Sequence, residues 1–255
     1  MYRILIASLL CAIAMPSVGG WFGTQFSADA VQVQPQGQRT TGKMFVGSER
    51  VRTEMERDGQ LVVEVVSPAK GVAWLLFPAG KVYLERELGP AMAAMAGSGK
   101  GDPCAGSPGM TCRRIAEERL NGRASIKWEI SGTAPGHTFH SSQWLDAEHG
   151  FPVRQEVAGQ PLFELRHVGV ETIGGRHTEK WESAIYSPDG AVGRGIQWYD
   201  PRLNTAIRQE MPGGHLRELT DIREGEQPNH LFTLPSDYKK VDSLPGRVPG
   251  SPGRK

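Results

Sequence analysis

Alternating apolar and charged positions dominate the chain beyond its first fifty residues. Residues 51–56 alternate in this way, which is the period of a strand with one buried face. The pattern resumes over 61–65 after Asp58-Gly59, a dipeptide typical of a hairpin turn. Four more strands are predicted, over residues 26–33, 43–47, 71–77 and 81–87. Because the connections are too short for parallel crossovers, the N-terminal half is predicted to be an antiparallel meander.

Helical patterns are few. Residues 90–96, rich in Met and Ala, predict about two helical turns, and residues 113–120 are a second candidate. The Gly97 to Lys100 stretch lacks the glycine and the hydroxyl residue that a phosphate-binding loop requires, because Ala94 and Gly101 occupy those positions. The predicted fold is therefore mainly β, a curved antiparallel sheet with one or two short helices.

An internal repeat lies in the C-terminal half of the chain. The two copies, residues 122–166 and 175–220, align at an offset of 53 and then 54 positions. The matched motifs are Lys127-Trp128-Glu129 with Lys180-Trp181-Glu182, Gln143-Trp144 with Gln197-Trp198, Arg154-Gln155-Glu156 with Arg208-Gln209-Glu210, and Glu164-Leu165 with Glu218-Leu219. Each copy predicts three or four strands. Two copies are too few for a solenoid, so they extend the meander.

The repeat carries four of the six tryptophans, Trp128, Trp144, Trp181 and Trp198. They either line a ligand cavity, because indole offers a large apolar face and one donor, or fill an ordinary core. The recurring Arg-Gln-Glu suits a solvated strand face with cross-strand charge pairs. A catalytic centre is expected once, whereas these residues occur twice. The sequence therefore predicts a protein that is not an enzyme.

The N-terminus is typical of a secretory signal. Arg3 precedes an apolar stretch from Ile4 to Met15, and small residues follow up to Gly20. The stretch is shorter than the roughly 20 residues of a transmembrane helix. Cys11 follows two leucines instead of the small residues that lipidation requires. We expect cleavage near Gly20 and an exported, soluble protein that is not transmembrane.

Charge is nearly balanced along the chain, with 29 Lys and Arg against 28 Asp and Glu, a net charge of +1. The two signs are mixed throughout, which argues against a nucleic-acid partner. Residues 21–243 are predicted to form one β domain. The tail over 244–255, rich in Pro and Gly with three basic residues, is predicted to be disordered.

Cys104 and Cys112 remain as a pair once the leader is removed. The turn-forming residues between them predict a disulfide, with a stabilisation of about 2 to 3 kcal/mol. A redox pair or a zinc site is disfavoured, because no Cys-x-x-Cys spacing is present. His137 and His140, with His149 nearby, are the best metal candidates, but a spacing of three in a strand points side chains to opposite faces. We therefore expect no metal and no cofactor.

Several short motifs resemble exported bacterial proteins of the LolA/LolB lipoprotein-carrier superfamily, in particular uncharacterised periplasmic relatives with a Cys pair followed by Gly-Arg and Trp-Glu. The motifs are Phe26-Ser27-Ala28-Asp29, Gly42-Lys43-Met44, Glu49-Arg50-Val51-Arg52 and the closing Leu231-Phe232-x-Leu234-Pro235-x-x-Tyr238. The resemblance implies a periplasmic half-barrel whose concave apolar side holds acyl chains. A related domain of the envelope-stress regulator RseB serves in sensing.

The resemblance also implies candidate site residues. An early-strand arginine holds a lid in the carriers, and Arg50 and Arg52 both lie in that neighbourhood. The candidate ligand-binding residues are therefore Arg50 and Arg52, the four tryptophans of the repeat, and Trp74 and Leu76, which lie on apolar strands. The long capping helices of the carriers have no clear counterpart. Two functions remain open, namely binding of a lipid or lipoprotein acyl chain, and an interaction or sensor module for an envelope protein.

Overall fold

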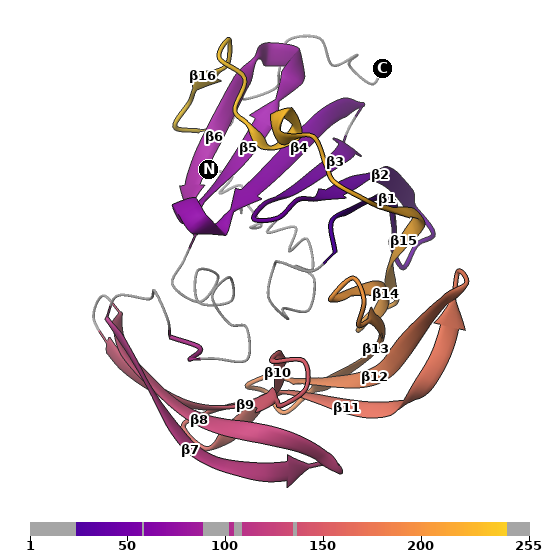
Figure 1. The fold of residues 1–255 in the computed structure, drawn as a ribbon. Helices are drawn as coiled ribbons and strands as arrows, with labels where there is room; N and C mark the ends of the chain where they lie inside the picture. Colours follow the sequence, from indigo (N-terminus) through magenta and orange to yellow (C-terminus); the bar gives the residue numbers. More distant parts are fainter. Residues whose placement is uncertain (1–23, 58, 89–101, 105–108, 135–136, 244–255) are drawn as a thin grey trace, which may run out of the picture.

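The computed structural model describes residues 24–57, 59–88, 102–104, 109–134 and 137–243. Their strands form one sheet in the order β16-β6-β5-β4-β3-β2-β1-β15-β14-β13-β12-β11-β10-β9-β8-β7. Every neighbouring pair is antiparallel except β16 with β6. The sheet is thus two meanders joined where β1 pairs with β15, and Figure 1 shows that it is curled and open. The predicted mainly β fold is confirmed.

The first meander confirms the strands expected from alternation. Its strands are β1 Phe26–Val33, β2 Arg39–Val46, β3 Val51–Arg57, β4 Gln60–Ser67, β5 Val72–Phe77 and β6 Val82–Glu87. In β3, Val51, Thr53 and Met55 are buried while the residues between them are half-buried. Gly59, between β3 and β4, has a φ of +73°, the left-handed conformation that a tight hairpin turn requires. The helix expected over 90–96 lies outside the described residues.

The second meander corrects one expectation. Its strands are β7 Met110–Leu120, β8 Arg123–Ala134, β9 His137–Asp146, β10 Pro152–Val157, β11 Gln160–Ile173, β12 Arg176–Tyr186, β13 Val192–Asp200, β14 Thr205–Met211 and β15 His215–Glu224. The helix considered over 113–120 is wrong, because these residues lie in β7. Asn121 and Gly122 both have positive φ, which is the turn that folds β7 back onto β8 as a hairpin.

Three single-turn 3-10 helices complete the described elements, η1 Pro68–Lys70, η2 Pro78–Gly80 and η3 Asn229–Phe232. Residues 225–243, the C-terminal segment, contain η3 and β16 Lys239–Lys240. This segment crosses one face of β3 to β6 (Figure 1). No helix among the described residues has the length and apolar character needed to cross a membrane.

The two faces of the first meander carry different clusters. Phe26, Met44 and Met55 pack with Leu203 in one cluster, and Leu203 belongs to the β13–β14 loop, which lies inside the curl (Figure 1). We call this the inner face. Side chains alternate between faces along a strand, so the cluster of Trp74 and its neighbours under the C-terminal segment lies on the opposite, outer face.

Candidate ligand site on the inner face

The contacts of Trp198 recur at Trp144, its counterpart in the first copy of the repeat. The indole of Trp198 lies between the Lys180 ammonium, 5.2 Å from the ring centroid, and the Arg208 guanidinium, 5.3 Å from it. Its Nε1 donates to Glu171 at 2.6 Å. Trp144 has the equivalent partners Lys127, Arg154 and Glu118. These indoles are enclosed by the chain's own charges, which is a scaffold role.

The other two tryptophans of the repeat differ from each other. Trp181 is buried, lies edge-on to Phe151 at 5.2 Å between ring centroids, and donates from Nε1 to Glu179 at 3.2 Å. Trp128 is half-buried, and its buried Nε1 has no hydrogen-bond partner among the described residues. The duplicated pattern thus leaves one indole donor unsatisfied. A role for these four tryptophans in ligand binding stays a prediction.

Trp74 and Leu76 lie on the outer face of β5, in a cluster with Phe232. Trp74 donates from Nε1 to Glu85 at 2.9 Å. Arg52 donates to the Leu231 carbonyl at 2.9 Å, and Arg50 stacks its guanidinium 5.6 Å from the Phe232 ring centroid. All four side chains therefore hold the C-terminal segment, and their expected contact with a ligand stays a prediction.

The expected disulfide between Cys104 and Cys112 is confirmed, with a Cα–Cα separation of 5.6 Å. Cys112 lies in β7, the strand at one end of the sheet. The bond therefore ties the residues before β7 to the edge of the sheet.

A row of polar side chains crosses the inner face over six neighbouring strands. Residues paired in register on adjacent strands project to the same face. The row runs, in register, through His167, Trp181, Gln197, Gln209, Arg217 and Gln32. We call it the polar row. No local sequence pattern predicts it, because the register between β1 and β15 pairs Gln32 with the distant Arg217.

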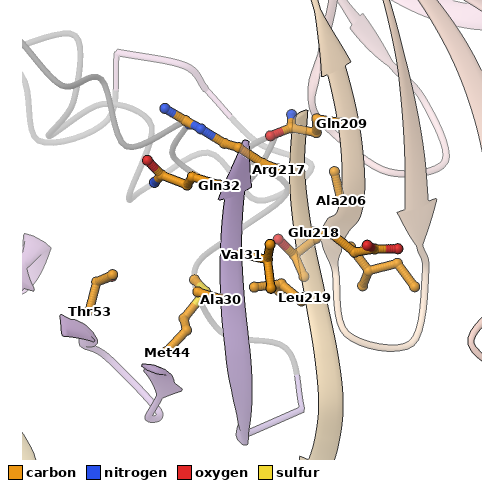
Figure 2. A pocket seen from close by; sticks show the side chains of 12 residues that line it. Ala30, Val31, Gln32, Met44, Thr53, Ala206, Gln209, Arg217, Glu218 and Leu219 are labelled. Carbon is orange, nitrogen blue, oxygen red and sulfur yellow. The ribbon is translucent and has the colours of Figure 1, made fainter. Parts of the chain in front are cut away.

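One end of the polar row borders a hollow of about 60 Å³. The residues that line it are Ala30, Val31, Gln32, Met44, Thr53, Thr205, Ala206, Ile207, Gln209, Arg217, Glu218 and Leu219. Figure 2 shows Gln32, Gln209 and Arg217 grouped at one end, with Ala30 of β1 and Met44 of β2 further from that end. The hollow thus has a polar end and an apolar floor, the arrangement that binds an amphipathic molecule.

A second polar cluster joins the two copies and was not foreseen. His149 Nε2 lies 3.0 Å from both carboxylate oxygens of Glu179, and both side chains are largely buried. Glu148 is close enough to complete a set of three metal-type ligands, but it pairs with Arg123 at 3.0 Å. Burial opposes ionisation of Glu179, and the hydrogen bond from His149 outweighs it, so the pKa of Glu179 lies below its ordinary value. The cluster is satisfied by protein partners.

Comparison with solved structures finds proteins of similar fold. A LolA superfamily protein from Nitrosomonas europaea is 11% identical, with 85% of this chain and 94% of that chain covered and a TM-score of 0.44. A putative outer membrane lipoprotein-sorting protein domain from Vibrio parahaemolyticus is 14% identical, with 84% and 91% covered and a TM-score of 0.39. A chain of the MucA/MucB complex of Pseudomonas aeruginosa is 13% identical, with 83% of this chain and 97% of that chain covered and a TM-score of 0.25.

The likeness is one of fold. These structures include the superfamily that the sequence motifs resemble. No protein-family model matches the sequence. No curated protein matches it either. At these identities residues are not transferred from one chain to another, so the candidate site rests on the geometry of this chain alone.

Proposed function

We propose that this chain is a non-enzymatic binding protein whose inner face takes the apolar part of an amphipathic ligand, such as the acyl chain of a lipid or lipoprotein. The hollow between β1, β2, β3, β14 and β15 carries this proposal. Most of its floor is apolar and buried, and three of its polar side chains, Gln32, Gln209 and Arg217, gather at one end (Figure 2). Pockets that bind small molecules combine an apolar lining with a few placed polar groups in this way.

The volume of the hollow limits what enters it without rearrangement. About 60 Å³ accommodates a few heavy atoms, the end of an acyl chain. A longer chain requires a side chain of the floor to move. Met44 suits this role, because its unbranched thioether side chain adopts many shapes at little cost. Binding therefore depends on an adaptable floor under β1 and β2.

Export to the periplasm belongs to the same proposal. The disulfide between Cys104 and Cys112 supports an oxidising compartment, because such bonds persist outside the cytosol. We propose that residues 1–20 are the signal and that cleavage occurs near Gly20. Both lie outside the described residues. N-terminal sequencing of the protein recovered from the periplasm tests this directly, and an intact leader would contradict it.

Binding is tested with fluorescent fatty acids and with native mass spectrometry of protein extracted mildly from cells. Ala30→Phe fills the hollow, and we expect it to weaken fatty-acid binding about tenfold, since an added ring occupies the site of the chain end. Ala28→Phe is the matched control, because Ala28 lies on the same strand and face but does not line the hollow. A wild-type protein that binds no fatty acid and carries no lipid contradicts the proposal.

A second candidate function is an interaction or sensor module for an envelope protein. The observation that favours it is the end strand β7. It pairs only with β8 among the described strands, and most of its eleven residues are exposed. An unpaired strand edge accepts a strand from another chain. Crosslinking from positions in β7 in cells tests this candidate, and recovery of no specific partner counts against it.

A further inference from the structure

Among the positions where the two copies of the repeat differ, one lies at the polar end of the hollow. Aligning Glu164-Leu165 with Glu218-Leu219 places Phe163 of the first copy where the second copy has Arg217. Phe163 packs against the cluster that contains Trp181. Arg217 lies instead at the polar end of the hollow. The arginine is therefore present in one copy alone, and it lies beside a hollow instead of in the aromatic cluster.

The surroundings of Arg217 concentrate hydrogen-bond donors. Gln209 and Gln32 flank it in register on the two adjacent strands, and Figure 2 shows the three side chains together at one end of the hollow. Glu218 is the acidic residue that lines the hollow, and its carboxylate accepts from Arg208 at 3.1 Å. The end of the hollow therefore combines a positive charge with two amide groups.

Gln197 extends the same group of donors along the polar row. Its Oε1 accepts from Gln209 Nε2 at 3.4 Å. The side chain is 7% exposed, and its Nε2 has no hydrogen-bond partner among the described residues. A buried donor without an acceptor is unfavourable, so an acceptor supplied beside Gln197, which neighbours Gln209 in the polar row, would be stabilising.

From this arrangement we infer that the ligand carries an anionic, oxygen-bearing head group, a carboxylate or a phosphate. Arg217, Gln209 and Gln32 bind the head group, and the chain attached to it enters the hollow beside Ala30 and Met44. Guanidinium groups bind such oxyanions through charge-assisted hydrogen bonds, the stronger class of hydrogen bond. The inference rests on the proposed function and adds the chemistry of the head group to it.

Three probes of equal chain length test the inference: dodecanoate, dodecyl phosphate and dodecanol. Each displaces a neutral dye, phenylnaphthylamine, from the purified protein at neutral pH. We expect at least one of the two anions to bind about tenfold more tightly than dodecanol, as a charge-assisted contact predicts. Arg217→Met removes this preference and leaves the affinity for dodecanol unchanged. Arg223→Met, an exposed change on the same strand, preserves the preference.

The outcomes separate the inference from the proposed function. Preference for one of the two anions identifies the head group as carboxylate or phosphate. Equal affinities for the three probes, or a preference retained in Arg217→Met, overturn the inference and leave acyl binding intact. Binding of none of the probes overturns both. If Arg217→Met fails to fold, the wild-type protein decides, because the preference for the anion must fall as salt is raised, and an unchanged preference is contrary to the inference.

Discussion

Asp146 and Asp200 occupy equivalent positions in the two copies, and both are buried. Asp146 accepts from Arg123 Nε at 2.8 Å and from the His149 backbone N–H at 2.9 Å. Asp200 is paired with Arg176 and accepts from the Leu203 backbone N–H at 3.2 Å. Each carboxylate thus fixes the start of the loop that follows its strand. The next residues diverge, since His149 in one copy corresponds to Leu203 in the other.

Replacing Asp146 by Asn is expected to lower the free energy of unfolding by about 2 to 3 kcal/mol at neutral pH, because hydrogen bonds to a charged group are lost. Burial raises the pKa of Asp146, but the hydrogen bonds from Arg123 and His149 outweigh it, and the pKa lies below its ordinary value. The stabilisation is therefore present above the unfolded pKa of about 3.9 and is lost as the pH falls through the folded pKa.

Urea unfolding of wild type and Asp146→Asn at neutral and at acid pH measures this difference. The difference in the free energy of unfolding between the two proteins is expected to shrink below about pH 4. Asp221→Asn, at an exposed ion pair with Arg223, is the control and leaves stability nearly unchanged. A difference in unfolding free energy that stays constant down to acid pH would show that the charge of Asp146 contributes nothing to stability.

At the scale of elements, Arg52 is predicted to keep the C-terminal segment in place. Arg52→Met retains the apolar stem and removes the donor to the Leu231 carbonyl. Loss of such a hydrogen bond, worth about 1 kcal/mol, raises local opening of residues 229–241 about fivefold. Hydrogen–deuterium exchange of this segment measures the change. Arg57→Met, on the same strand, is the control, and equal exchange in the two variants would contradict the role given to Arg52.

The sequence pattern predicts the strands of the first meander correctly but fails at residues 113–120 of the second. The strands of the first meander follow from strict alternation, as in Val51, Thr53 and Met55, because a period of two fits only a strand with one buried face. The failure over 113–120 has a physical reason. Several good helix formers lie there, but the Asn121-Gly122 turn and pairing with β8 override local propensity.

At the scale of the whole molecule, the candidate site depends on contacts that no local pattern encodes. Ala30 pairs with Leu219 in the β1–β15 ladder, and the hollow exists because this ladder brings the two meanders together. Such register is set by burial of both strands at once. The family resemblance implies a concave apolar face. The position of Arg217 beside Gln32, by contrast, follows only from the β1–β15 pairing seen in the structure.

The same ladder predicts how the protein unfolds. Leu203 and Ile207 of the second meander are buried against Phe26 and Met55 of the first, so the two meanders share part of their core. We expect one cooperative urea transition, with tryptophan fluorescence and circular dichroism coinciding. Leu203→Ala leaves a cavity in the shared cluster and lowers the free energy of unfolding by about 2 to 4 kcal/mol, moving both signals together. Leu162→Ala, at an exposed position, moves neither. Two separate transitions, of which Leu203→Ala shifts one alone, would instead show that the meanders fold as independent domains.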